Sequence, residues 1–527
     1  MKSYKIRFII ILLALHVSGT SIHSQSVEIT QQQIPVLTLT EGTPVMLIKV
    51  NTGNNIAEIR AVNIDLTGTS DLRDLESIKV FYYRENLKDS IQFGKTLRPS
   101  QHLRFKGKIS LSSGTGYFRV FVKLKDNADI LHSMVARCSG IKTSDETIVP
   151  GVGNKPLKLR FGTALCQHME DGVHTYRIPG IVRTNNGTLL AIFDRRIEAR
   201  RDPQGEMNIG LKRSTDGGKT WEPVSVILDR GSWGGLPPRY NGISDACILV
   251  NTNNNDIYVG ALWMHGQWVK GKWEGVPSDP NSELGRKTGS MPGMTEKETC
   301  QLLITKSIDD GKTWSEAINM TKIKKPEWPL YALSPTNGIT LEDGTLVFPS
   351  KIPGNVAITY SQDGGQTWTV SNLGPKTNGV ENAIVQLSDG SIMLNARSMG
   401  RTKYRTVYTT PDLGKTWIEH PTNSKVLIEP GCHGSLYKHT YSANGEKKSI
   451  LLFSNPNSTE KRERMTLKVS FDEGMTWPEK YWILLDEGRS AYSSITSVDD
   501  QTIGILYEGS QAHMTFQKIA LTEFTEE

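Results

Sequence analysis

Ser214-Thr-Asp-Gly-Gly-Lys-Thr-Trp221 is the first of five copies of one short phrase, and these copies decide the fold. Asp can accept backbone N–H bonds, Gly allows a positive φ and Trp can pack between layers, so the phrase suits a hairpin turn. We call each copy an Asp box and expect its Asp to stabilise a turn rather than to act in catalysis. The pattern is S/T-x-D-x-G-x-T-W, and the other copies occupy residues 307–314, 361–368, 410–417 and 470–477.

The spacing of the boxes predicts a β-propeller. Their Asp residues are separated by 93, 54, 49 and 60 positions, and a recurrence near fifty residues is typical of propeller blades. A second, independent repeat consists of turn-rich centres flanked by apolar strands, and each of the first five is followed by one Asp box. Alternating inner and outer hairpins give four strands per blade and six blades in all. The inner hairpins centre on residues 185–187, 251–255, 342–344, 388–390, 443–445 and 499–500.

Two domains are expected, and both are all-β because strand-like runs and Gly, Asn and Asp turns dominate. The propeller should span 157–527, with the run 514–521 closing the ring beside an early strand at 157–161. Residues 25–150 lack the repeat, and alternating runs such as 36–40, 78–83 and 117–124 predict a small β-sandwich. Residues 149–156 have the composition of a linker. The sandwich either binds carbohydrate or packs on the propeller, and the sequence leaves both alternatives open.

Bulk properties exclude several classes of function. Residues 1–24 are typical of a secretory signal, with Lys2, Lys5 and Arg7 before a short apolar run, which predicts a secreted or periplasmic protein, with cell-surface association as an alternative. Removal of residues 1–24 takes away three cations and no acid, so the net charge falls from +6 to +3. This small excess of positive charge does not indicate nucleic-acid binding. No other segment resembles a membrane span. Five widely spaced cysteines favour unpaired buried thiols over a disulfide framework.

Polar side chains are expected to converge at one mouth of the propeller, on the face away from the Asp boxes. Each inner hairpin can be mirrored about its turn, which pairs residues that should lie opposite each other at its open end. Asp245 should begin the first strand of blade two. Asp202 and Arg462 fall in the loops between the second and third strands of blades one and five. The mirrored pairs are Glu381 with Arg397, Tyr492 with Glu508, and Arg177 with Arg195.

At these residues the chain resembles the sialidase (neuraminidase) family. Tyr176-Arg-Ile-Pro179 resembles the F/Y-R-I-P motif of that family, and the five Asp boxes are its other signature. The resemblance covers about 157–527, and the N-terminal part is similar to the accessory β-sandwich of some bacterial members. Two departures are the fourth box, which begins with Thr410, and the long loop 265–298, which is rich in Trp, Lys and Glu.

The resemblance implies a triad of arginines that grips a substrate carboxylate. Arg177 and Arg397 match the first and second members. Arg462 matches the third because it lies eight residues before the Ser of the last box, and Arg464 is the alternative. Glu508 matches the carboxylate that orients Arg177.

The resemblance also implies the catalytic groups. Tyr492 matches the nucleophile, Glu381 its partner base and Asp202 the acid/base. Arg196 and Asp245 match groups that line the sugar pocket, although Asp245 could equally cap a strand. No metal ion or other cofactor is implied.

These residue types suit sialic acid, which carries a carboxylate on its anomeric carbon. Planar guanidinium groups bind a carboxylate bidentately and stay charged. A neutral Tyr can approach this anionic centre without the repulsion that a carboxylate nucleophile would meet, provided that a base takes its proton. Sialidases with a Tyr nucleophile are a known exception to the scheme of two carboxylates. The expected chemistry is retention through a covalent glycosyl-tyrosine.

The resemblance therefore implies an exo-α-sialidase that acts on sialylated glycoproteins, glycolipids or oligosaccharides. A trans-sialidase or an intramolecular trans-sialidase remains an alternative, because acceptor handling depends on loops. A non-catalytic Asp-box propeller that binds glycan or protein should lack the triad, Tyr492 or Asp202. A glycosidase for neutral polysaccharide would have no reason for three convergent arginines.

Overall fold

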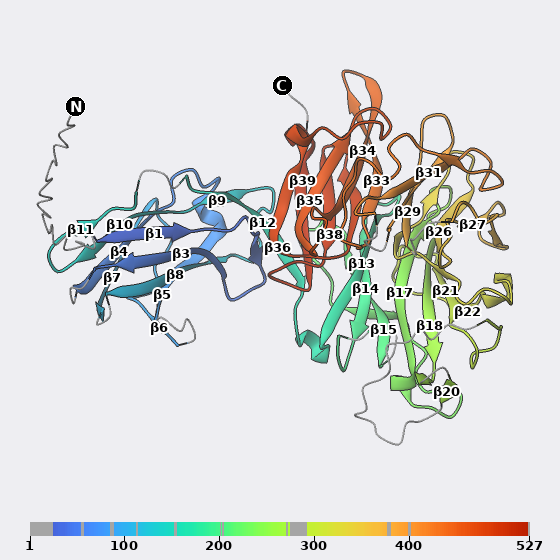
Figure 1. Cartoon of the computed structure of the whole chain (residues 1–527), viewed down its shortest axis with the longest axis horizontal. Coiled ribbons are helices and arrows are strands. Elements are labelled where there is room, and N and C mark those ends of the chain that lie inside the picture. The colour runs from blue at the N-terminus through green and yellow to red at the C-terminus, as the bar shows by residue number, and fades with distance from the viewer. Residues whose placement is uncertain are drawn as a thin grey trace, which may run out of the picture.

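The computed structural model describes residues 25–53, 57–84, 89–111, 114–151, 155–200, 202, 205–269, 272–274, 292–376, 381–398 and 402–524. These residues form strands and six short 3-10 helices and contain no α-helix, which confirms the all-β prediction. A sandwich of two sheets, blue in Figure 1, lies beside a propeller coloured from green to red. The expected signal segment, 1–24, lies outside the described residues. None of the described helices has the length and apolar character that a membrane crossing requires.

The N-terminal sandwich follows from strict alternation of buried and exposed side chains. Strand β8 (Thr115–Leu124) buries every second residue, as a sheet with one face on a core requires. One sheet has the order β1-β3-β8-β5-β6 and the other β11-β10-β4-β7. The remaining bounds are β1 (Ser26–Thr30), β3 (Thr43–Asn51), β4 (Ala57–Asp65), β5 (Leu75–Tyr83), β6 (Ser90–Gln92), β7 (His102–Leu111), β10 (Arg137–Thr143) and β11 (Thr147–Ile148).

Six sheets arranged as blades form the propeller, which confirms the predicted count. In each of the first five blades the strands pair in chain order, and an inner hairpin turns where the sequence predicts it. Blade one contains β13 (Thr175–Arg183), β14 (Leu189–Arg196), β15 (Met207–Ser214) and β16 (Ser225–Leu228). Blade two contains β17 (Asn241–Val250), β18 (Ile257–His265), β21 (Gln301–Ser307) and β22 (Ile318–Asn319). Blade three contains β25 (Ile339–Thr340), β26 (Leu346–Lys351), β27 (Ile358–Ser361) and β28 (Thr369–Val370).

The last three blades follow the same plan, except that blade six borrows its outer strand from the beginning of the propeller. Short additional strands pair at the edges of blades two and three, namely β24 (Thr336–Asn337) and β23 (Ala332–Leu333). The strands β19 (Gln267–Val269) and β20 (Lys272–Glu274) form a separate two-stranded sheet. Blade four contains β29 (Asn382–Gln386), β30 (Ile392–Ala396), β31 (Thr406–Thr410) and β32 (Ile418–Glu419). Blade five contains β33 (Ser435–Ala443), β34 (Glu446–Pro456), β35 (Glu463–Ser470) and β36 (Ile483–Arg489). Blade six contains β37 (Ser493–Asp499), β38 (Thr502–Tyr507), β39 (Met514–Ala520) and β12 (Lys158–Cys166).

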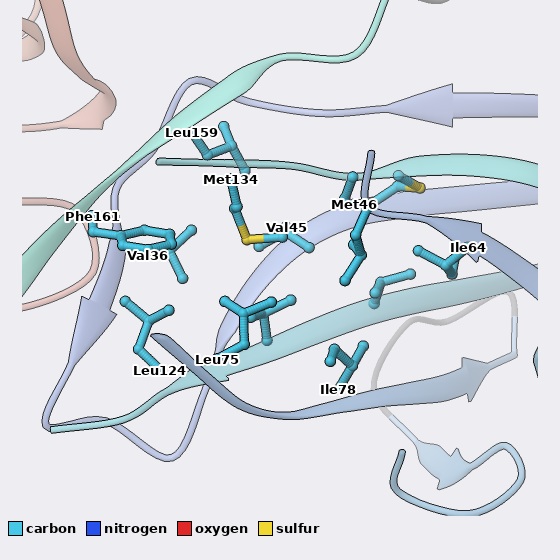
Figure 2. Packing of buried hydrophobic residues seen from close by; sticks show 14 of the residues in the cluster. Val36, Val45, Met46, Ile64, Leu75, Ile78, Leu124, Met134, Leu159 and Phe161 are labelled. Atoms are coloured by element: carbon cyan, nitrogen blue, oxygen red, sulfur yellow. The ribbon is translucent and has the colours of Figure 1, made fainter. Parts of the chain in front are cut away.

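Strand β12 closes the ring and also joins the two parts of the molecule. It pairs with β39 through Thr163 opposite Phe516, so the run 514–521 closes the ring as predicted. The pairing residues, Thr163, Ala164 and Cys166, lie beyond the early strand that was expected at 157–161. The other edge of β12 pairs with β2 (Val36–Thr38) and β9 (Ser133–Val135) from the N-terminal part. The run 36–40 was therefore expected wrongly as a sandwich strand, because β2 extends blade six instead. Figure 2 shows Phe161 beside Val36 and Leu159 near Met134, in one apolar cluster that continues into the sandwich.

The Asp boxes are the turns between the third and fourth strands, as expected, and each third strand ends on the Ser or Thr of its box. In the first box Ser214 and Thr220 donate to the carboxylate of Asp216 at 2.8 and 2.6 Å, and the backbone N–H of Thr220 adds a further bond at 2.9 Å. Because strands alternate in direction, these turns share a face with the turns of the inner hairpins. Thr188 in an inner turn accordingly bonds to Asp310 in the second box.

All five cysteines are buried and none forms a disulfide, as the sequence predicted. Burial raises the pKa of the Cys138 thiol to about 11, so this thiol stays protonated at neutral pH.

Candidate active site

Tyr492 lies at the open end of the β37–β38 hairpin, opposite Glu508. The backbone N–H of Glu508 donates to the carbonyl oxygen of Tyr492 at 2.9 Å, so the mirrored pairing from the sequence is correct. The Tyr492 side chain is buried, and its hydroxyl donates to Glu381, whose two oxygens lie 2.8 and 2.7 Å away. Arg397 Nη1 donates to the same hydroxyl at 3.0 Å. The phenol is therefore held between a carboxylate and a guanidinium from blade four.

Glu381 and Arg397 lie opposite each other at the end of blade four, again as mirrored. The Arg397 backbone N–H donates to the Glu381 carbonyl at 2.7 Å, and its Nη1 donates to Glu381 Oε2 at 2.7 Å. Lys351, the last residue of β26, places its Nζ 3.6 Å from Glu381 Oε1. Glu381 thus sits between two cations and the phenol, with only 4% of its surface exposed.

The charges around Tyr492 fix two protonation states. Burial acts to raise the pKa of Glu381, but Arg397, Lys351 and His433 outweigh it and the pKa lies well below its usual value. Burial and the neighbouring Glu381 carboxylate raise the pKa of Tyr492 well above its usual value. At neutral pH the site therefore holds an ionised carboxylate that accepts a hydrogen bond from a neutral phenol.

Arg177 enters the site through a β-bulge in β13. Ile178 has a φ of 59°, and the register with β14 shifts between Arg177 and Gly180. Arg177 therefore lies opposite Asp194, and the predicted pairing of Arg177 with Arg195 is wrong by one residue. The inner hairpin turn does lie where expected, so the bulge alone explains the one-residue error in the partner predicted for Arg177.

Glu508 holds the Arg177 guanidinium in place. Arg177 Nε lies 3.0 and 3.2 Å from the two oxygens of Glu508, and the Ile178 backbone N–H donates to the same carboxylate at 3.1 Å. The guanidinium carbon lies 5.4 Å from the centre of the Tyr492 ring. Because of the bulge, the side chain of Arg177 and the backbone N–H of Ile178 both bind the Glu508 carboxylate.

Asp202 lies in the loop after β14, where two arginines meet its carboxylate. Arg196 Nη1 donates at 2.7 Å and Arg177 Nη1 at 3.2 Å, yet 75% of the Asp202 side chain is exposed. Partial desolvation acts to raise the pKa of Asp202, but Arg196 and Arg177 lower it below its usual value. In this arrangement Asp202 is an anion at the rim of the site.

Arg462, and not Arg464, faces Tyr492. The Arg462 guanidinium carbon lies 5.9 Å from the centre of the Tyr492 ring, and its Nη2 donates to the Gly431 carbonyl at 3.0 Å. Arg464 has a side chain that is 47% exposed and lies 4.0 Å from Glu487. Arg177, Arg397 and Arg462 therefore converge on one tyrosine from blades one, four and five.

Sequence reasoning missed two charges, Asp194, which is fully buried, and Lys351, whose side chain is 14% exposed. Asp194 accepts from Arg196 Nη2 at 2.8 Å and from the Asp245 backbone N–H at 3.0 Å. Burial raises the pKa of Asp194 to about 7, against the opposing effect of Arg196. Lys351 donates to Asp245 at 2.8 Å and thereby links blades two, three and four. No motif marks either residue, but mirroring with the bulge included would have placed Asp194 opposite Arg177.

Asp245 is positioned differently from the prediction. It does not begin its strand, because β17 starts at Asn241 and Asp245 sits at a register shift with a φ of 57°. This left-handed conformation turns its N–H to Asp194 while its carboxylate meets Lys351, so its side chain does not act as a strand cap.

A second layer of charge supports the site from behind. Arg405 and Glu429 form an ion pair at 2.8 Å with both side chains fully buried. Glu429 also accepts from the backbone N–H of Ser398, which follows Arg397, and Arg405 donates to the Cys432 carbonyl at 2.8 Å. The pair therefore connects the segment that carries Arg397 with the segment that packs on Tyr492.

Within the described ranges no group of three or more His, Cys, Asp or Glu side chains is arranged to hold a metal ion.

Comparisons with known proteins show the family of the chain. A family model described as the N-terminal domain of BNR-repeat neuraminidase matches residues 24–147, and one described as a BNR repeat-like domain matches residues 178–508. A sialidase of Bacteroides fragilis (strain YCH46) is 37% identical over 499 residues, which cover 91% of this chain and 89% of that protein. This chain belongs to the sialidase family. It is a glycoside hydrolase of that family, as the sequence predicted.

Solved sialidase structures share the fold. The structure named Hadza microbial sialidase Hz136 aligns with a TM-score of 0.85 at 33% identity and covers 94% of this chain and 100% of its own. The intramolecular trans-sialidase from Ruminococcus gnavus aligns with a TM-score of 0.54 at 20% identity over 68% of this chain and 96% of its own, a likeness of fold alone.

Proposed function

We propose that this sialidase-family enzyme is an exo-α-sialidase that releases terminal sialic acid from glycoproteins, glycolipids or oligosaccharides with retention of configuration. The observation that carries the proposal is the convergence of three guanidinium groups on a buried phenol whose hydroxyl donates to an ionised carboxylate. Residues 1–24 support a secreted or periplasmic location for this activity.

The three arginines bind the substrate carboxylate. Arg177 has its Nε committed to Glu508, while Arg397 Nε is buried without a hydrogen-bond partner among the described residues. The Arg462 side chain makes one hydrogen bond, to a backbone carbonyl, and no ion pair with the described residues. Charge-assisted bonds to a bound carboxylate would satisfy these donors and fix the anomeric carbon near the Tyr492 oxygen.

Tyr492 attacks the anomeric carbon while Glu381 accepts the phenolic proton. The glycosidic bond breaks, a bond from the phenol oxygen to the anomeric carbon forms, and the leaving oxygen takes a proton from Asp202. A positive charge that develops at the anomeric carbon makes the phenol more acidic as the new bond forms, which compensates for the low basicity of Glu381. Hydrolysis reverses these roles, since Asp202 then takes a proton from water as water displaces the tyrosine.

Asp202 must be protonated to act as an acid, although its arginine partners keep its pKa low in the unliganded site. A substrate carboxylate that occupies Arg177 weakens this pairing and adds a like charge nearby, and both effects raise the pKa of Asp202. Arg196, held by Asp194, and Asp245, held by Lys351, line the adjoining part of the pocket.

The proposal is tested by turnover of a fluorogenic sialoside. Tyr492→Phe should lose at least about 10³-fold in kcat with the melting temperature retained, because it removes only the nucleophilic oxygen. Tyr258→Phe is the matched control, since this buried tyrosine donates to the Gly364 carbonyl in the third Asp box and lies on the other face. A 2,3-difluoro sialic acid should lose its anomeric fluoride and add one 3-fluorosialyl mass on Tyr492. Full activity of Tyr492→Phe would contradict the assignment of Tyr492 as the nucleophile.

Product analysis by proton NMR separates hydrolysis from transfer. Free sialic acid that appears first as the α-anomer supports a retaining hydrolase. An anhydro sugar as the first product would instead establish an intramolecular trans-sialidase, in which a hydroxyl of the bound sugar replaces water.

A further inference from the structure

A small cavity adjoins the sialic-acid site on the side of blades one and six. Its volume is about 180 Å³, and it lies where the start of β13, the end of β36 and the loop after β38 meet. It includes Arg177 and Glu508 but not Tyr492, Glu381 or Arg397, so it is a neighbour of the catalytic centre rather than part of it. Arg200, Arg489 and Ser490 also line it.

Three side-chain donors in this cavity have no partners. Arg200 and Arg489 are exposed, and neither side chain forms a hydrogen bond or an ion pair with the described residues. Ser490 is 2% exposed, and its buried hydroxyl has no hydrogen-bond partner there. A buried polar group without a partner costs free energy, so an unpaired hydroxyl beside two unpaired guanidinium groups indicates a place for an acceptor.

The acceptor must be an anion. The one carboxylate that lines the cavity, Glu508, is committed to the side chain of Arg177 and the backbone of Ile178. Desolvation and the nearby charges of Arg489, Arg177 and Arg462 lower the pKa of Arg200, which means that these cations repel one another. The carboxylate of a bound sialic acid engages the triad, so the charge of Arg200 and Arg489 is left for a second anion.

The cavity lies toward the leaving group. Arg200 precedes Asp202 by two residues, and the Asp202 carboxylate contacts Arg177, which forms one wall of the cavity. If Asp202 protonates the leaving oxygen, as the proposed function requires, the sugar attached to that oxygen extends to this side.

We propose that this cavity is a subsite for an anionic group on the sugar that leaves, and that Arg489 and Arg200 select substrates that carry one. The proposal rests on the proposed function. A carboxylate or a sulfate ester suits two guanidinium groups and a hydroxyl, because both present several acceptor oxygens. The carboxylate would come from an inner sialic acid in an α2,8-linked pair, and the sulfate from a sulfated galactose or glucosamine.

The test compares kcat/KM for three substrates that share the same terminal sialic acid. They are a sialyllactose with a neutral leaving group, an α2,8-linked disialyllactose, and a sialyllactose with a sulfate on the leaving sugar. The wild type should prefer at least one anionic substrate by about tenfold, the effect expected of one charge-assisted hydrogen bond. Added salt should reduce this preference because the subsite is open to solvent.

The ratio of kcat/KM for the preferred anionic substrate to kcat/KM for the neutral one should fall at least about threefold in Arg489→Gln and in Arg200→Gln. Arg489→Glu should reduce this ratio further. Arg464→Gln is the matched control, since it removes an exposed arginine outside the cavity and should leave the ratio unchanged. A response confined to the disialyl or to the sulfated substrate identifies the source of the anion. A wild type without preference, or a ratio that Arg489→Glu leaves unaltered, overturns the subsite. Failure of the proposed function differs, because the wild type would then turn over none of the three substrates.

Discussion

The two ends of the same blades use carboxylates in opposite ways. At one end, each Asp box binds donors two to four residues away in the chain, and the turn repeats in five blades. At the other end, the Glu381 and Glu508 carboxylates are buried and bind distant residues, since Tyr492 meets Glu381 across 111 residues and Arg177 meets Glu508 across 331. No two blades contribute the same set of residues there.

The repeated Asp-box turns therefore stabilise the fold, and the residues that differ from blade to blade at the opposite end form the candidate active site. A local turn needs only its own octapeptide, so it can be copied. The catalytic end needs charges held at fixed distances by several blades at once, and such a network stays stable only when every member has its partner. Substitutions at the two ends should therefore have different consequences.

The largest effect should come from Glu429→Gln, which breaks the buried pair behind the site. Arg405 would keep a buried charge without its carboxylate, at a cost of about 3–5 kcal/mol in the free energy of unfolding. Because Ser398 loses its anionic acceptor, Arg397 should also lose its position and KM for a sialoside should rise. Chemical denaturation and steady-state kinetics measure the two effects.

The double variant Arg405→Met, Glu429→Met separates these effects. Apolar replacement of both partners should restore much of the stability without restoring KM. Unchanged KM in the single variant would show that the pair does not position Arg397.

A smaller effect is expected from Lys351→Met, and it should appear in the pH profile. The cation lowers the pKa of Glu381, so its removal raises that pKa, and the acid limb of kcat/KM should move to higher pH by about one unit or more. In the wild type the ionised Glu381 adds stability above its unfolded pKa near ~4.3 and loses it as the pH falls toward the lower folded value.

Lys351→Arg is the control for this prediction because it keeps the charge, and its acid limb should stay near that of the wild type. An acid limb that Lys351→Met does not move would mean that Glu381 ionisation does not limit the acid side of the profile.

The smallest effect should follow from Asp309→Asn in the second Asp box. Asn keeps one acceptor oxygen but loses the charge that binds Thr313, so the melting temperature should fall by about 1–3 °C and kcat should not change. The bonds of the box lower the pKa of Asp309 to about 2, with the Thr313 hydroxyl first among them. Its contribution is therefore present above about pH 4 and is lost as the pH falls toward 2, so the difference in melting temperature should shrink between pH 5 and pH 3. A large loss of kcat would contradict the separation of the two ends.

The regular parts of the molecule were predictable because a hairpin is symmetric about its turn. Mirroring placed Glu381 opposite Arg397 and Tyr492 opposite Glu508 without any structure. The β29–β30 hairpin has an unbroken register, and the β37–β38 hairpin shifts only beside its turn, between Ser497 and Asp499. Mirroring failed by one residue at Arg177, where a bulge with a positive φ at Ile178 inserts a residue. A non-glycine residue in this conformation leaves no reliable signal in a single sequence.

Two charged residues were not predicted. Asp194 and Lys351 belong to no motif, and a lone charged residue in a strand is usually solvated. Lys351 meets Asp245 only where blades two and three lie side by side, and Asp194, which pairs with Arg196 in its own strand, also accepts from the Asp245 backbone of the next blade. The choice between Arg462 and Arg464 needed the path of the loop before β35. The run 36–40 alternates as a sandwich strand would, and its pairing with β12 depends on a contact across the domain boundary.

The last two strands of the propeller, β38 and β39, have a consequence for chains that are cut short during synthesis. Glu508 follows β38, and β39 is the only element that joins β38 to β12 among the described strands. A truncation product that ends near residue 505 keeps Tyr492 and all three triad arginines, yet it lacks Glu508, which binds the Nε of Arg177, and it leaves two strand edges unpaired. Such edges recruit other strands, so an incomplete chain is prone to aggregate instead of persisting as a damaged glycosidase.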